Sequence, residues 1–287
     1  MATLVGRPNV GKSTLLNQLV GTKVSIVSDS PQTTRNQIHG VWNGPGIQVV
    51  FIDTPGIHKP KTELGRRLNQ RSLETLGAVD VVCFLVEANA PIGAGDRYIA
   101  GLLHKLETPV ILVVNKTDDA APAEILGHLA GASSTLGDFA AYVPLSARTG
   151  QNTDALLEEI TARLPEGPAY YPDGVVTDQA ETFLAAELLR EKLLAVAREE
   201  LPHSLAVTIE DVEERPDLLI VRVVVRVERD SQKGIVIGKG GAVIKEAGTA
   251  ARQELEALLG TKVHLETRVK VDKDWQRRPD RLDRLGL

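Results

Sequence analysis

The chain contains an eight-residue stretch, GRPNVGKS at residues 6–13, that fits the phosphate-binding pattern GxxxxGK[ST]. Apolar residues precede it and a helical pattern of leucines follows it, so we expect a strand, a loop and a helix N-terminus in that order. Glycines in such a loop let backbone N–H groups close around phosphate oxygens. We therefore expect Lys12 to contact the β- and γ-phosphates of a nucleotide and the Ser13 hydroxyl to bind Mg²⁺. The other nucleotide-binding candidates here are Gly6, Asn9, Val10, Gly11 and Thr14.

Residues 1–165 alternate apolar runs with amphipathic stretches such as residues 63–76. This alternation of strand and helix patterns predicts a mostly parallel α/β sheet. Residues 40–51 are the exception, because NGPG at residues 43–46 is a hairpin signal that predicts one antiparallel strand at the sheet edge. The other predicted strands lie at residues 47–52, 79–86, 110–114 and 141–145.

The pattern changes after residues 166–179, which begin in a stretch rich in proline and glycine and are predicted to be a linker. The following residues, 180–287, read as a second, α+β domain that opens with an amphipathic helix. Its predicted elements are a helix at 180–200, strands at 204–212 and 218–228, a glycine-rich loop, a helix at 242–259 and a final strand at 262–271.

Composition narrows the classes of function. The 287 residues suffice for two domains at about 100–200 residues each. The net charge is −5, but from Ser231 onward 12 Lys and Arg stand against 8 Asp and Glu, which suggests a local site for a polyanion. We find no secretory signal, no apolar run near the roughly 20 residues of a membrane span, and only one cysteine. These features predict a soluble, cytoplasmic protein.

Two motifs besides the first loop are placed to sense the γ-phosphate. In DTPG, the Asp53 carboxylate can hold Mg²⁺ through water, and Gly56 lets a backbone N–H approach the γ-phosphate. In TTR, a threonine can ligate Mg²⁺; we favour Thr34, with Thr33 left open. The catalytic candidates are therefore Lys12, Thr34 and Gly56, and the metal-binding candidates are Ser13, Thr34 and Asp53.

A third motif, NKTD, decides the base. The Asp118 carboxylate can accept hydrogen bonds from guanine N1–H and N2–H₂, a donor pair that adenine lacks, and an unpaired carboxylate penalises the wrong base. A helix N-cap is the alternative role for this aspartate. Ser146 and Ala147, which follow the last predicted strand of the first domain, would contact guanine O6 through backbone N–H groups. The candidates around the base are Asn115, Lys116, Asp118, Ser146 and Ala147.

A GxxG loop, GKGG at residues 238–241, precedes a helical pattern in the second domain. In KH modules such a loop packs against a nucleic-acid backbone, because glycine permits close approach. Apolar neighbours would line a groove for unstacked bases, and nearby lysines would meet phosphates, with a solvated surface as the alternative for the lysines. The RNA-binding candidates are Lys233, Ile237, Gly238, Lys239, Gly240, Gly241 and Lys245.

The order GRPNVGKS, TTR, DTPG, NKTD and SA resembles the translation-factor-related GTPases. A GTPase domain followed by a type II KH domain resembles the Era family over essentially the whole chain. The resemblance implies an α/β P-loop GTPase domain at 1–165 and an α+β type II KH domain at 180–287. It also implies GTP, GDP and Mg²⁺ as ligands, no other small-molecule substrate, and a role in assembly of the 30S ribosomal subunit through binding of the 3′ end of 16S rRNA.

The resemblance carries two expectations about rate and switching. Ile57 stands where Ras-like relatives place a water-orienting glutamine, so slow intrinsic hydrolysis is expected. Asn9 matches relatives that recruit K⁺ in place of an arginine finger, with stabilisation of the loop as the alternative. Switch segments at residues 32–38 and 57–62 would favour RNA binding in the GTP state, and hydrolysis would release the RNA.

Two rival functions remain at this stage. One is an RNA-binding module in which the nucleotide is only structural. The other is a peripheral membrane-associated GTPase at the inner face of the cell membrane that couples GTP to cell division. The basic tail at residues 270–284 permits contact with a membrane surface, but acidic residues are interleaved and no apolar helix face accompanies them.

Overall fold

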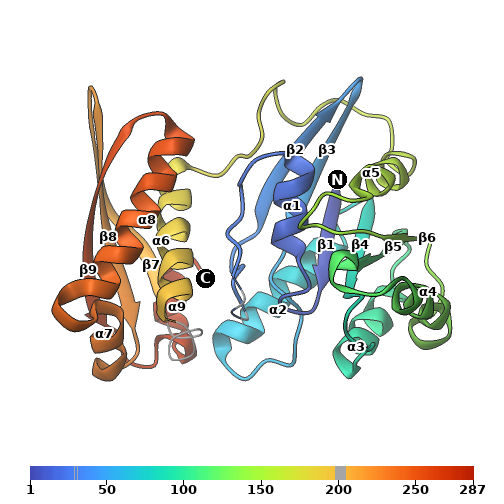
Figure 1. Ribbon diagram of the computed structural model, residues 1–287, viewed down its shortest axis with the longest axis horizontal. Helices are drawn as coiled ribbons and strands as arrows, with labels where there is room; N and C mark the ends of the chain where they lie inside the picture. The colour runs from blue at the N-terminus through green and yellow to red at the C-terminus, as the bar shows by residue number, and fades with distance from the viewer. Residues whose placement is uncertain (29, 31, 198–204) are drawn as a thin grey trace. The chain divides into compact units, whose positions relative to one another are not determined.

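The computed structural model describes residues 1–28, 30, 32–197 and 205–287, and the chain divides into two compact units (Figure 1). The first unit comprises Met1–Ser25, Thr34–Lys61 and Gly65–Asp178. The second comprises Ile26–Thr33, Thr62–Leu64 and Gln179–Leu287. Each unit has its own sheet and hydrophobic core.

The first unit is built on a six-stranded sheet in the order β2-β3-β1-β4-β5-β6. All neighbouring strands are parallel except β2, which pairs antiparallel with β3 at the edge. The predicted α/β fold with one antiparallel edge strand is therefore confirmed. The strands are β1 (Ala2–Gly6), β2 (Ile38–Gly44), β3 (Ile47–Asp53), β4 (Val81–Glu87), β5 (Val110–Asn115) and β6 (Ala141–Pro144).

Helices cover this sheet and leave its central strands buried on both faces. Val82, Phe84 and Val86 of β4 belong to a core cluster shared with α2, α3 and α4, while Cys83, which points to the other face, is also buried. Such continuous apolar strands are typical of covered parallel sheets. The helices are α1 (Lys12–Val20), α2 (Glu63–Leu76), α3 (Ala94–Leu103), α4 (Pro122–Leu136) and α5 (Thr153–Thr161), with a short 3-10 helix η1 (Thr117–Asp119).

The second unit has a three-stranded sheet in which β8 is central, antiparallel to β7 and parallel to β9. Alternate valines of β8 pack with leucines of α6 and with small residues of α8 in one core. The order of elements confirms the α+β KH fold. They are α6 (Glu181–Ala197), β7 (Ala206–Arg215), β8 (Leu218–Val227), α7 (Asp230–Ile237), η3 (Lys239–Gly241), α8 (Ala242–Leu259) and β9 (Lys262–Val271).

Helix α7 is an element between β8 and the GxxG loop that the sequence pattern did not predict. The apolar run GIVI at residues 234–237 forms its last turn, and Val236 is fully buried in the core of the unit. Tertiary packing therefore overrides the strand preference of these β-branched residues. The predicted helix at 180–200 and the predicted strand at 204–212 both extend into residues 198–204, which lie outside the described residues.

The segment predicted as a linker runs along the edge strand of the first sheet. The Val41 backbone N–H donates to the Val176 carbonyl at 2.8 Å, and Gln48 Nε2 donates to the Tyr171 carbonyl at 2.9 Å. The first of these contacts satisfies a backbone N–H group that the edge strand β2 leaves unpaired. The domain boundaries at residues 165 and 180 stay a prediction.

The C-terminal segment after β9 forms the 3-10 helix η4 (Trp275–Arg277) and the short helix α9 (Pro279–Arg284). Trp275 and Leu282 are fully buried, so the large apolar side chains of this basic tail pack into the protein. Within the described ranges, each helix is too short or too polar to cross a bilayer.

Candidate functional site

The loop at residues 6–13 connects β1 to α1 and is held against β5. Gly11 has a φ of 98°, in the left-handed region that favours glycine, and a Cβ atom there would lie 2.2 Å from Asn115 Nδ2. That amide nitrogen donates to the Val10 carbonyl at 2.8 Å, and Asn115 is buried. The loop therefore has a fixed backbone shape that depends on glycine and on the asparagine of NKTD.

Lys12 lies inside this loop with 6% of its surface exposed. Its ammonium group donates to the backbone carbonyls of Arg7 at 2.9 Å and Gly6 at 3.4 Å. Burial lowers the pKa of Lys12 to about 8, with the nearby Asp53 carboxylate acting in the opposite direction. A buried ammonium group that is held only by neutral carbonyls gains strongly from an anionic phosphate.

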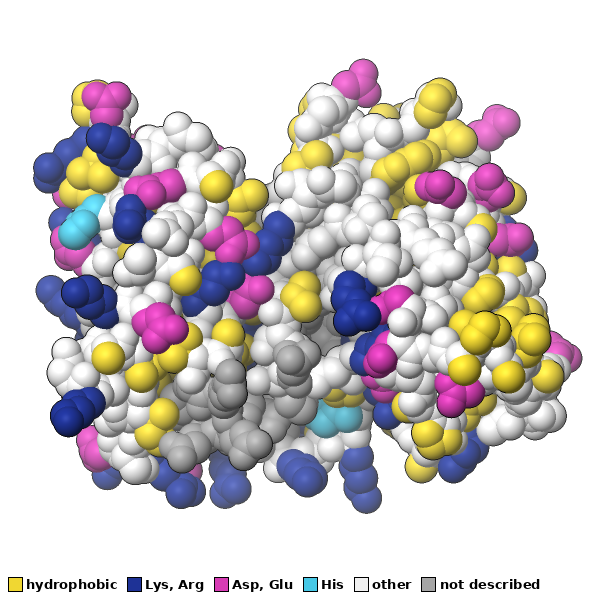
Figure 2. Space-filling model, in the orientation of Figure 1, with side chains coloured by type: hydrophobic (Ala, Val, Ile, Leu, Met, Phe, Trp, Pro, Cys, Tyr) yellow, Lys and Arg dark blue, Asp and Glu magenta, His cyan; other side chains and the backbone are white. Residues whose placement is uncertain are grey.

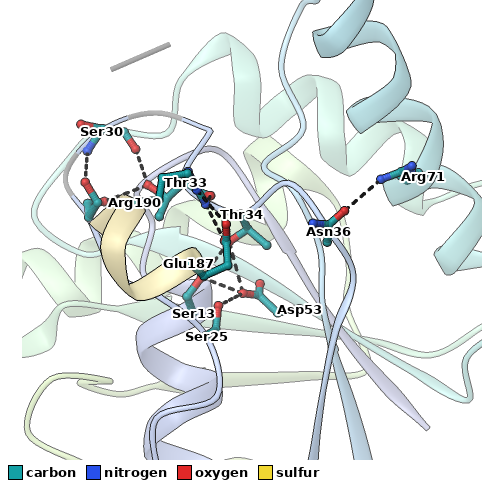
Figure 3. A network of polar contacts seen from close by, with 11 residues as sticks. Ser13, Ser25, Ser30, Thr33, Thr34, Asn36, Asp53, Arg71, Glu187 and Arg190 are labelled. Carbon is teal, nitrogen blue, oxygen red and sulfur yellow. Dashed lines mark hydrogen bonds and ion pairs between the residues drawn. The ribbon is translucent and has the colours of Figure 1, made fainter. Parts of the chain in front are cut away.

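Three hydroxyl groups surround the Asp53 carboxylate (Figure 3). Asp53 Oδ2 accepts hydrogen bonds from Ser13 Oγ at 2.6 Å, Ser25 Oγ at 3.0 Å and Thr34 Oγ1 at 3.3 Å. Burial raises the pKa of Asp53, and Lys12 and the hydroxyls oppose that effect. Asp53 Oδ1 is buried without a hydrogen-bond partner in the part of the chain that the structure describes.

This cluster fits Mg²⁺, which prefers oxygen ligands and commonly uses one or two carboxylates together with substrate phosphates. The described residues contain no group of three or more His, Cys, Asp or Glu that could hold a metal by themselves. A magnesium ion would therefore depend on hydroxyls, one carboxylate and the phosphates of the nucleotide.

The two adjacent threonines of TTR point to different places. Thr34 Oγ1 lies 2.9 Å from Ser13 Oγ, whereas Thr33 Oγ1 donates to the Ser30 carbonyl at 2.6 Å. Of these two hydroxyl groups, only that of Thr34 reaches the Asp53 cluster. The geometry favours Thr34 over Thr33 as the candidate ligand.

DTPG brings its glycine against the loop at residues 6–13. A Cβ atom on Gly56 would lie 2.7 Å from the Pro8 backbone nitrogen, so only glycine fits this approach. The Ile57 backbone N–H donates to the Gly6 carbonyl at 3.2 Å, and the Ile57 side chain is buried. The Ile57 side chain has no polar atom with which to orient a water molecule.

The motifs that are predicted to select the base meet at Asp118. Ser146 Oγ donates to Asp118 Oδ1 at 2.6 Å, and the exposed Arg148 forms an ion pair with the other carboxylate oxygen. The hydrogen bond from Ser146 is the largest cause that lowers the pKa of Asp118. The Ala147 backbone N–H donates to Asn115 Oδ1 at 2.9 Å, so one asparagine ties the SA turn to the phosphate loop.

The GxxG loop forms η3, between α7 and α8, and has an open backbone. Gly238, Gly240 and Gly241 have φ values of 72°, 62° and 81°. A Cβ atom on Gly238 would lie 2.9 Å from the Val243 backbone nitrogen, but one on Gly240 or Gly241 would meet nothing within 4 Å. The loop thus presents backbone to solvent at two of its glycines.

The lysines around this loop are available for an anionic partner. Lys239 and Lys245 are exposed and Lys233 is half-buried, and within the described residues none of their ammonium groups has an ion-pair partner. Ile237, the apolar candidate beside the loop, is partly buried. Figure 2 shows Lys and Arg side chains scattered over the visible face of the second unit, with Asp and Glu among them.

Two family models match the chain: 50S ribosome-binding GTPase at residues 1–116 and KH domain at residues 200–276. The GTPase Era of Heliobacterium modesticaldum is 51% identical over 286 residues, which cover 99% of this chain and 95% of that protein. The chain belongs to the Era family of GTPases. Its predicted resemblance to that family is confirmed.

Two solved Era structures match 99% of this chain and 97% of their own length. Era in complex with MgGDPNP and nucleotides 1506–1542 of 16S ribosomal RNA matches with a TM-score of 0.96 at 41% identity. A variant of Aquifex aeolicus Era bound to GDP and AlF4⁻ matches with a TM-score of 0.95 at 40% identity. These matches confirm the two-domain Era fold, the GTPase class, and GTP or GDP with Mg²⁺ as the ligand set. The roles of individual residues stay predictions.

Sequence analysis missed several residues that support this Era-family site. Glu87 pairs with Lys116 of NKTD and, at 3.3 Å, with Arg7 of the phosphate loop, whose Nε also donates to Asp96 at 2.7 Å. Ser25 contacts Asp53 from a segment without any motif. Only Glu87 had a signal in the sequence, because it is the last residue of β4 and lies at the carboxyl edge of the sheet, where the other site residues also lie.

Proposed function

We propose that this chain hydrolyses GTP slowly and binds the single-stranded 3′ end of 16S rRNA during assembly of the 30S subunit. The observation that carries the proposal is the full-length match to an Era crystallised with MgGDPNP and nucleotides 1506–1542 of 16S ribosomal RNA. The nucleotide lies in the first unit, and the GxxG loop of the second unit contacts the RNA.

In the first unit, each candidate has a defined role in the proposal. Lys12 binds the β- and γ-phosphates, and the backbone N–H of Gly56 faces the γ-phosphate. Ser13, Thr34 and Asp53 hold Mg²⁺, Asp53 through water. The ion neutralises negative charge on the phosphates when it is bound. The support for the magnesium site is that the hydroxyl groups of Ser13 and Thr34 both donate hydrogen bonds to the Asp53 carboxylate in this structure.

Slow hydrolysis follows from what the site lacks. Ile57 is buried and apolar, so the attacking water is not oriented by this side chain. Asn9 is exposed at the outer end of the loop with a φ of 66°, a position compatible either with binding K⁺ or with stabilising the loop. Single-turnover hydrolysis in K⁺ and in Na⁺ separates these roles, because equal rates would remove the potassium hypothesis.

The RNA would follow the backbone of the GxxG loop, since two of its glycines leave room for a phosphodiester to approach. Lys239 and Lys245 would contact phosphates, and Ile237 would line the groove for unstacked bases. In the proposal, the GTP state of the first unit favours RNA binding by the second unit, and hydrolysis releases the RNA.

The experiment compares two RNAs of the same composition, one copying nucleotides 1506–1542 of 16S rRNA and one scrambled. The proposal expects tight binding of the copied sequence by the full chain with a GTP analogue, and steady-state GTP turnover that rises when 30S subunits are present. Equal affinity for both RNAs, or absence of turnover with subunits present, would contradict the proposal and favour a module in which nucleotide is structural.

The proposal places the protein in the cytoplasm with the 30S subunit as its partner. Association with the inner face of the cell membrane is the alternative, and flotation with anionic liposomes tests it. The buried Trp275 and Leu282 leave little apolar surface on the tail for insertion into a membrane. We therefore expect the protein to stay at the bottom of the gradient.

A further inference from the structure

The segment Ile26–Thr33 belongs to the second unit, although the residues on both sides of it belong to the first. Ser25, which precedes the segment, and Thr34, which follows it, both donate hydrogen bonds to Asp53 Oδ2. The segment therefore begins and ends at the candidate magnesium site. We call it the bridging segment.

Helix α6 holds the bridging segment inside the second unit. Ile26 is 1% exposed and lies in the same core cluster as Leu188 and Leu189 of α6. At the other end of the segment, Arg190 Nη2 of α6 donates to the Thr33 carbonyl oxygen (Figure 3). These contacts connect α6, through the peptide chain, to the hydroxyl that reaches Asp53.

Arg190 is an unusual residue for such a place, because it is 1% exposed. Glu187 orients it through two hydrogen bonds, Nε to Oε1 at 2.8 Å and Nη2 to Oε2 at 2.6 Å. Its Nη1 is buried without a hydrogen-bond partner among the described residues. A buried ion pair is weak evidence for stability, since apolar residues of similar volume often serve as well. The pair therefore calls for a role other than filling the core.

The geometry of the peptide bond supplies that role. The carbonyl of Thr33 and the N–H and Cα of Thr34 lie in one peptide plane. A donor that holds the Thr33 oxygen therefore also restricts the position and direction of the Thr34 backbone. We propose that Arg190, oriented by Glu187, is a positioning residue for GTP hydrolysis that holds Thr34 in place to ligate Mg²⁺. The proposal rests on the magnesium role of Thr34 in the proposed function.

The same link works in both directions. A nucleotide that binds through Thr34 also stabilises the contact between Thr33 and Arg190. Thermodynamic reciprocity then requires that this contact raises the affinity for that nucleotide by the same factor. Arg190 lies on the first helix of the unit that carries the GxxG loop.

The test measures single-turnover GTP hydrolysis as a function of Mg²⁺ concentration in Arg190→Met, a change that keeps most of the side-chain volume. We expect the half-saturating Mg²⁺ concentration to rise about tenfold, the size expected when a hydrogen bond to a charged group is lost. GDP affinity should stay within about twofold, because Thr34 responds to the γ-phosphate state. Arg190→Lys should recover part of the loss, since an ammonium group can still donate to the carbonyl.

Lys192→Met is the matched control. Lys192 lies on the same helix and pairs with Glu254 of α8 at 2.5 Å, so its removal also deletes an ion pair of α6. Its Mg²⁺ dependence should equal that of the wild type. If Arg190→Met does not fold, Glu187→Gln supplies the test, with an expected rise of about threefold from a weakened orienting pair.

A double-mutant cycle with Thr34→Ala separates positioning from a general structural effect. If Arg190 acts through Thr34, the double variant hydrolyses GTP no more slowly than Thr34→Ala alone. Additive losses, or an Arg190→Met variant with wild-type Mg²⁺ dependence, would overturn the role of Arg190. Wild-type hydrolysis by Thr34→Ala would instead remove the magnesium role of Thr34 and with it that part of the proposed function.

Discussion

The two glycine-rich loops of this protein use the same residue for opposite purposes. In the phosphate loop, a Cβ atom on Gly6 would lie 2.7 Å from the Leu85 carbonyl oxygen and one on Gly11 2.2 Å from Asn115 Nδ2. In the GxxG loop, a Cβ atom on Gly240 or Gly241 would meet nothing within 4 Å. The first loop is closed by tight packing against β4 and β5, whereas the second leaves the space beside two of its glycines open.

The largest expected effect comes from Gly11→Ala. The new methyl group would displace Asn115, which also holds Val10 and Ala147, so the loop and the base site would be disturbed together. We expect GTP affinity to fall by more than about a hundredfold, since several buried hydrogen bonds are lost at once. Titration with a fluorescent guanine nucleotide measures this.

Gly101→Ala is the control for that change, because Gly101 lies in α3 and a Cβ atom there meets nothing within 4 Å. It should leave nucleotide affinity unchanged. If Gly11→Ala also bound GTP normally, the description of the phosphate loop as closed would be wrong.

A second prediction concerns selectivity for guanine, which we assign to the nucleotide site and not to the GxxG loop. Asp118→Asn replaces an acceptor pair with one acceptor and one donor, so GTP affinity should fall about a hundredfold. Xanthosine triphosphate, which carries a carbonyl where guanine carries its amino group, should bind the variant better than GTP does. Competition binding with both nucleotides measures the ratio, and a variant that still prefers GTP would remove the assigned role of Asp118.

A third prediction sharpens the contrast at the open loop. Gly241→Asp and Gly241→Asn place side chains of nearly equal size at the same φ of 81°, but only aspartate adds a negative charge. We expect RNA affinity to be about tenfold lower in the aspartate variant than in the asparagine variant, from repulsion of a nearby phosphate. Nucleotide affinity should be equal in both. Equal RNA affinity would place the RNA backbone elsewhere.

The smallest expected effect is that of Lys239→Ala. This lysine is exposed, so its removal should weaken RNA binding only a few-fold. The dependence of log affinity on log salt concentration should become shallower by about 0.7 if one phosphate contact is lost. An unchanged slope would mean that Lys239 belongs to a solvated surface.

Sequence patterns were sufficient for the fold and for locating the motifs of the proposed nucleotide site, because both depend on local signals. The phosphate loop, DTPG and NKTD each place a small number of residue types at fixed spacing after a strand. The preference for Thr34 over Thr33 had little support in the sequence, since neighbouring side chains of a loop point in directions set by a backbone that no local pattern determines. The structure separates them by their hydrogen bonds.

The remaining residues act through tertiary contacts. Ser25 reaches Asp53 across 28 positions and Arg190 reaches Thr33 across 157, and neither belongs to a motif. The assignment of the bridging segment to the second unit has the same origin, because it depends on packing against α6. Periodicity within one element cannot report such contacts.

The most direct test of the account is the affinity of the full chain for single-stranded RNA copying the 3′ end of 16S rRNA. It is measured with a GTP analogue, with GDP and without nucleotide, all at one Mg²⁺ and salt concentration. A GTP-switched RNA-binding protein predicts tight binding with the analogue and weak binding with GDP. Equal affinity in all three states would contradict the coupling of the GTPase site to RNA capture, and absence of binding in every state would contradict the RNA-binding function itself.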